Sequence, residues 1–110
     1  MFVKQRSIFM INIHVLQELY KKNRKGDMGT GIQIVTAEDG NWNVLIDLFN
    51  TEYEGKDFTP VVIHNDSNSW VRCFKENQIF KGFGGAENLA DILDIFNMWL
   101  NGKEIQAFNN

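Results

Sequence analysis

The chain has little of what stabilises very small domains or carries common catalytic chemistry. Its 110 residues include one cysteine, one proline and two histidines. The lone cysteine, Cys73, excludes a disulfide within the chain. The apolar residues gathered at 1–13 are too few to span a bilayer, and no small-residue cleavage site follows them. We therefore expect a protein of the reducing cytoplasm, with no membrane partner.

Composition favours one folded domain over residues 1–110, with 1–10 and 102–110 peripheral. Hydrophobic residues make up 44% and aromatic residues 13%, which is enough for a packed core without metal or disulfide. The net charge of −3 gives little support for phosphate neutralisation, so a nucleic-acid partner is not expected.

Charge is unevenly distributed along the chain. A basic cluster (Lys21, Lys22, Arg24 and Lys25) suits the carbonyl end of a helix, and this explanation is favoured over a binding role. A second stretch is acidic and contains Lys56 as its one cation. Its carboxylates are Glu38, Asp39, Asp47, Glu52, Glu54 and Asp57. This stretch is either a solvated face with a polar loop or an acidic surface for a basic partner.

Apolar periodicity predicts an α+β fold. Spacings of three and four predict a helix over about 8–23, with Ile8, Ile11, Val15 and Leu19 as its stripe, widened by Leu16 and Tyr20. A second helix is predicted over 86–100. Alternation and turn signals predict strands over 31–37, 42–49, 59–64, 70–74 and 78–83. We expect a five-stranded, mostly antiparallel sheet with the N-terminal and C-terminal helices packed on one face.

The second strand gives the clearest two-sided pattern. Trp42, Val44, Ile46 and Leu48 share one face, which should point to the core. Residues 38–41 carry a hairpin signal, and Pro60 fits only the start of a strand or an edge.

No set of residues converges on catalysis. His14 and His64 stand in no metal-ligand spacing, so neither a metal nor a cofactor is expected. Cys73 is best explained as a small core residue. A reactive thiolate would need a positive charge beside it, and Arg72, its neighbour in sequence, should point to the opposite face of the sheet. No catalytic residue is predicted.

Gly84 and Gly85 are interpreted as a bend between a strand and a helix, permitting positive φ and a close approach. A phosphate site there is the weaker alternative, because Glu87 would lie in the first helical turn and satisfy the helix dipole. Valine at Gly85 should destabilise the fold.

The three tryptophans are most simply core residues. Trp42 and Trp99 each fall in a predicted apolar face or stripe. Trp70 shares its strand face with Arg72, so for this tryptophan the alternative to a core role is a partly exposed position that anchors a protein–protein interface.

The order of these motifs resembles the immunity protein 53 family of bacterial polymorphic toxin systems. The similarity covers roughly residues 12–100. It is carried by GIQIVT at 31–36, Trp42 with VLIDL at 44–48, TEYEGKDFTP at 51–60, WVRC at 70–73, FKGFGG at 80–85, and NLADIL at 88–93 with Phe96 and Trp99. The chain departs from the family pattern at 21–30, where KKNRKGDMGT lacks a tryptophan and acid pair.

The resemblance implies a non-enzymatic inhibitor that binds the C-terminal domain of a toxin encoded beside it. A nuclease is one class of toxin that an acidic inhibitor would suit. The candidate surface is the loop 50–58, with Glu52, Glu54 and Asp57, together with the sheet face around Asp47, Trp70 and Arg72. Two alternatives remain: a regulator of another protein, and a small enzyme or ligand-binding domain using Cys73 or the glycine junction.

Overall fold

The computed structural model describes residues 13–22 and 31–102 of the chain. Five strands form one sheet: β1 (Ile32–Thr36), β2 (Trp42–Asp47), β3 (Val61–Asp66), β4 (Ser69–Glu76) and β5 (Ile79–Gly84). Helix α2 (Leu89–Leu100) follows, and residues 13–22 are helical before the sheet begins. The predicted α+β fold is confirmed.

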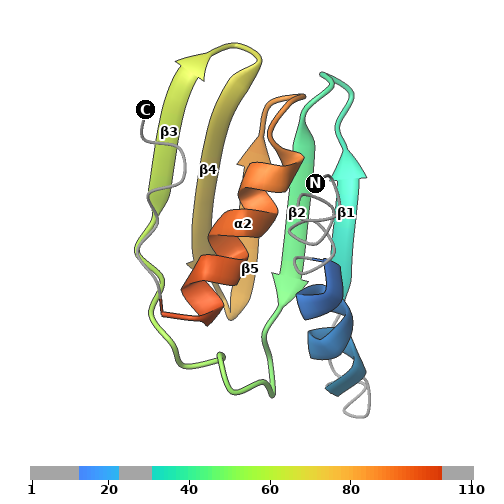
Figure 1. The fold of residues 1–110 in the computed structure, drawn as a ribbon, viewed down its shortest axis with the longest axis vertical. Helices are drawn as coiled ribbons and strands as arrows, with labels where there is room; N and C mark the ends of the chain where they lie inside the picture. Colours follow the sequence, from blue (N-terminus) through green and yellow to red (C-terminus); the bar gives the residue numbers. More distant parts are fainter. Residues whose placement is uncertain (1–12, 23–30, 103–110) are drawn as a thin grey trace, which may run out of the picture.

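The sheet order is β1-β2-β5-β4-β3, and every neighbouring pair is antiparallel. Two short hairpins join β3 to β4 and β4 to β5. These three strands therefore lie side by side in chain order, with β3 at the edge of the sheet. The last strand, β5, closes the sheet by pairing with β2, which places β5 in the centre (Figure 1).

Both helices pack on one side of this sheet (Figure 1). Helix α2 contacts β4 and β5, and the N-terminal helix contributes Leu16 and Leu19 to the same core. On β2, Val44 and Ile46 are fully buried, and Leu48 just beyond it is too, so the predicted core face is confirmed. Tyr20 is 54% exposed, which removes it from the predicted apolar stripe of the helix. The predicted helical residues 8–12 lie outside the described residues.

The strand-to-helix junction corrects three predictions. Asn88 N donates to Gly85 O at 3.0 Å, so the chain makes a turn first and α2 begins at Leu89 instead of residue 86. Glu87 therefore precedes the helix, and Asp91 is the acidic residue of its first turn. Gly84 and Gly85 are also absent from the positive-φ residues among those described, so positive φ was the wrong reason for glycine here.

Close approach is the correct reason for Gly85. Its N–H donates to Trp70 O at 3.0 Å, and a Cβ on Gly85 would lie 2.5 Å from Asn68 O. The buried Asn88 side chain accepts a hydrogen bond from Trp70 N at 3.0 Å and donates to Asp91 Oδ2 at 2.6 Å. The start of α2 is thereby fastened to the β3–β4 turn.

We expect Gly85→Ala to lower the free energy of unfolding by about 2–3 kcal/mol, because the added Cβ meets a backbone carbonyl that cannot rotate away. Chemical denaturation measures the loss. Gly55→Ala is the matched control, since a Cβ there meets nothing within 4 Å. Equal, small effects of the two substitutions would contradict the close-approach explanation.

Candidate functional site

The loop 50–58 is an ordered part of the core's edge, although its sequence is polar. Its first turn is closed at Leu48 O, which accepts from Thr51 N at 3.0 Å and from Thr51 Oγ1 at 2.7 Å. The same hydroxyl oxygen accepts from Tyr53 N at 3.0 Å. Hydrogen bonds between residues close in sequence therefore close this turn.

Aromatic packing holds the loop against the end of α2. The Trp99 ring centroid lies 6.1 Å from that of Tyr53 and 5.3 Å from that of Phe58. Phe58 also packs edge-on against Phe80 of β5, at 5.4 Å. Trp99 Nε1 donates to Asp57 O at 2.8 Å, which satisfies the indole N–H in this packed setting.

Two lysine ammonium groups bind backbone carbonyls of this region. Lys75 Nζ, reaching from β4, donates to Glu54 O and Lys56 O at 2.6 Å each and more weakly to Tyr53 O at 3.5 Å. Lys56 Nζ donates to Trp99 O at 2.7 Å. Since the loop's carbonyls converge on Lys75, the ammonium group fixes the backbone from inside the loop.

The acidic side chains of the loop differ in role. Glu52 and Asp57 are exposed, and each directly precedes an aromatic residue (Tyr53 and Phe58, respectively) that packs on Trp99. Glu54 is half-buried, and its Oε1 accepts from Asn50 N at 3.1 Å, so this carboxylate helps to hold the loop's own backbone. Burial, and after it the nearby charge of Glu52, raises the pKa of Tyr53.

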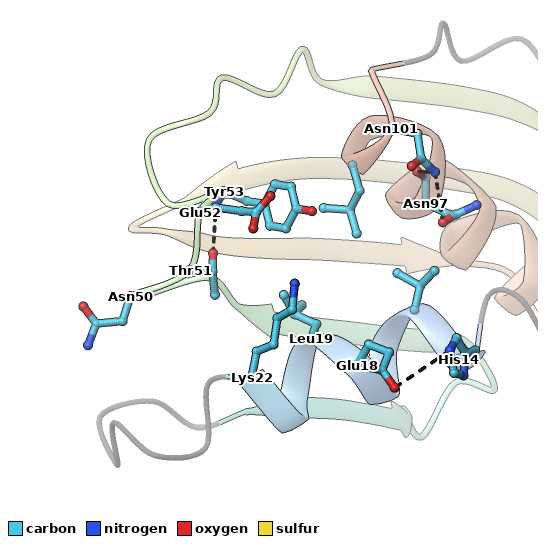
Figure 2. Close-up of a pocket in the computed structure, with 12 residues that line it drawn as sticks. His14, Glu18, Leu19, Lys22, Asn50, Thr51, Glu52, Tyr53, Asn97 and Asn101 are labelled. Carbon is cyan, nitrogen blue, oxygen red and sulfur yellow. Dashed lines mark hydrogen bonds and ion pairs between the residues drawn. The ribbon is translucent and has the colours of Figure 1, made fainter.

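A cleft of about 390 Å³ lies between the loop, the N-terminal helix and the C-terminal end of α2 (Figure 2). Apolar parts of Val15, Leu19, Tyr53 and Leu100 line it. The polar residues that line it come from all three elements: His14, Glu18, Lys22, Asn50, Thr51, Glu52, Asn97 and Asn101.

The other predicted surface residues lie on the face of the sheet opposite the two described helices. The register aligns Arg72 with Phe83 and Val62, and Trp70 with His64. Asp47 ends β2 on this face, where its Oδ1 accepts from Phe49 N at 2.9 Å. The structure therefore separates the predicted set: Asp47, Trp70 and Arg72 lie on one side of the sheet, and the loop packs on the other.

The residues considered for catalysis also lie apart. Cys73 is fully buried in the core, His64 is exposed on the edge strand β3, and His14 borders the cleft. Within residues 13–22 and 31–102, no group of three His, Cys, Asp or Glu side chains is placed to hold a metal ion. In the same residues, no helix is both long enough and apolar enough to cross a membrane.

A comparison with known protein families shows to which of them this chain is related. The family model described as immunity protein 53 matches residues 13–101, which is most of the chain. The chain belongs to the immunity protein 53 family. No curated protein and no solved structure matches it.

The immunity protein 53 match covers the helical residues 13–22, the whole sheet, the loop and α2, so the site lies inside the family domain. The divergent segment at 21–30 falls largely outside the described residues, which resume at Gly31.

Sequence reasoning found the acidic loop but missed the cleft and the lysine contacts. Tyr53 and Phe58 were the available signal, since two aromatics in a nine-residue polar loop indicate packing. Lys75 directly follows the predicted strand 70–74, and this position gave no sign that its ammonium group would enter the loop.

We expect Lys75→Met to lower the free energy of unfolding by about 1–3 kcal/mol, because two half-buried carbonyls lose their donor. Amide hydrogen exchange across 50–58 should accelerate. Lys81→Met is the control, since Lys81 pairs with the exposed carboxylate of Glu76 at the surface. Unchanged exchange in the loop would show that Lys75 does not hold it.

Burial raises the pKa of Cys73 from 9.0 to about 12. The contribution of the neutral thiol to stability is therefore complete below about pH 9 and is lost as the pH rises towards 12. We expect wild type to lose stability between pH 9 and 11 more steeply than Cys73→Ala, by at most about 1.4 kcal/mol per pH unit. Denaturant midpoints across this range measure the difference, and parallel curves would contradict it.

Proposed function

We propose that this protein binds the C-terminal domain of a polymorphic toxin and neutralises it by covering that domain's active site, in the cytoplasm of the producing cell. The family match carries the proposal. Support also comes from the loop 50–58, whose backbone is fixed by Lys75, Trp99 and its own turn. A surface that is already ordered loses less conformational entropy on binding.

The acidic side of this surface fits a basic partner. Glu52 and Asp57 are exposed on a loop whose one cation, Lys56, donates to Trp99 O, while Lys75 of β4 donates to the loop's own carbonyls. A nuclease domain has a basic groove for its substrate, so such a toxin would be both attracted to this surface and blocked by it. About 800 Å² on each partner is enough for a standard-size complex.

The alternative of a small enzyme has weaker support. Cys73 is fully buried with a raised pKa, which opposes a thiolate nucleophile. At the glycine junction, the space beside Gly85 is taken by Asn68. A regulator of some other protein would use the same loop, and the partner assay below distinguishes it from an immunity protein.

The direct test uses the protein encoded by the adjacent gene. Its C-terminal domain should arrest growth when expressed alone, and co-expression of this chain should restore growth. The two should co-purify. A toxic domain that is neither bound nor neutralised would overturn the proposal, as would turnover by the purified chain in the absence of any partner.

The double substitution Glu52→Lys with Asp57→Lys should slow association with that domain by about tenfold at low salt and flatten its salt dependence. Stopped-flow or biosensor kinetics measure both. Glu38→Lys with Glu87→Lys is the matched control, because it changes the net charge equally. Both residues are exposed, one in the β1–β2 turn and one between β5 and α2, and these connections lie at the end of the sheet opposite the loop (Figure 1). Equal effects of the two doubles would assign the rate to net charge and not to this loop.

A further inference from the structure

We propose that the cleft beside the loop receives one long cationic side chain of the toxin, an arginine or a lysine. The inference rests on the proposed function and deepens it, by naming the chemistry of the residue that enters. Its basis is the combination of an apolar floor with carboxylates on two opposing walls.

The floor suits the methylene stem of such a side chain. Leu19 is 7% exposed, and Val15, Leu100 and the Tyr53 ring are half-buried around it. The cleft is therefore closed at its base by core residues and open above. Arginine and lysine bury their stems on surfaces of this kind while their charged ends stay at a polar rim.

Each of two walls supplies a carboxylate. Glu52, on the loop, is exposed and borders the cleft beside Tyr53 (Figure 2). Glu18, on the N-terminal helix, has a side chain 43% exposed and lies 3.8 Å from His14 Nε2, a contact that is an ion pair only when His14 is protonated. Both carboxylates remain accessible to a cation from outside.

The third wall is the carbonyl end of α2, and its last turn contains no basic residue. Asn101 Nδ2 donates to Asn97 O at 2.9 Å and to Asn97 Oδ1 at 3.3 Å, so the acceptor oxygen is the group that its amide has left to offer. Lys56 binds Trp99 O and thereby offsets part of the negative potential of this helix end.

Lys22 opposes the proposed occupant. It is exposed and reaches from the N-terminal helix toward the loop (Figure 2). Among the described residues that line the cleft, two carboxylates against one ammonium group leave a net negative charge, which favours a cationic side chain over an anionic one. Removing the Glu18 carboxylate should therefore weaken binding of the toxin domain, and removing the Lys22 ammonium group should strengthen it.

The experiment measures Kd for an inactive variant of the toxin domain encoded beside this chain. We expect Glu18→Gln to weaken binding about tenfold and Lys22→Gln to tighten it about threefold. Glutamine has nearly the helix propensity of both residues, so the helix itself is little changed. His14→Gln is the matched control, because it breaks the same His14–Glu18 contact but keeps the carboxylate.

A scan of exposed toxin arginines and lysines to glutamine then identifies the occupant. One position should lose its effect on Kd when Glu18 is already glutamine, which is the coupling that a double-mutant cycle detects. Glu18→Gln behaving like His14→Gln, with no coupled toxin position, would overturn the cleft proposal and leave the immunity function intact. Reversed signs for Glu18 and Lys22 would show an anionic occupant and overturn it too. Absence of binding by wild type would instead reject the proposed function.

Discussion

The structure depends on the packing of Trp99 against the loop that connects β2 to β3. In the order β1-β2-β5-β4-β3, the chain must pass from β2 to the far edge before it returns strand by strand to the centre. That crossing covers three strand spacings, roughly 14 Å, and it runs past the end of the core. Tyr53 and Phe58 close the core there by contacting Trp99, and Trp99 Nε1 holds the Asp57 carbonyl. The connection required by the topology is therefore also the ordered surface available to a partner.

Short sequence patterns predicted the helices and strands well, because each of these elements is determined mainly by residues close together in the sequence. The alternation at 42–48, the hairpin at 38–41 and the apolar stripe of α2 each reflect contacts with near neighbours or with one continuous core. The start of α2 was predicted three residues too early, because Asn88 uses its side chain on Trp70 N, eighteen residues away. Periodicity could not include that long-range contact. Ile95 of α2 is fully buried together with Ile92, Phe96 and Trp99, so the core covers a wider part of this helix than one narrow row.

The candidate site was predictable as an acidic loop but not as a shape. Glu52, Glu54 and Asp57 look equivalent in sequence, yet Glu54 bonds to Asn50 N and the other two point outward. Lys56 reads as a neutralising cation, and in the structure its ammonium group binds the end of α2. Such assignments depend on where a distant helix ends. For the same reason, the predicted patch that joined the loop to Trp70 and Arg72 is divided between the two faces of the sheet.

Stability and the proposed toxin-binding surface rest on different residues in this fold. Trp99, Phe58 and Lys75 face inward and fix the loop, whereas Glu18, Lys22, Glu52 and Asp57 border the cleft or point to solvent. Surface substitutions at the second group change little in the core, so the charges offered to a toxin can vary while the loop keeps its path. A change in the first group would move the whole surface at once. An inhibitor that must follow a changing toxin gains from this separation, because a new partner then requires new rim charges and not a new fold.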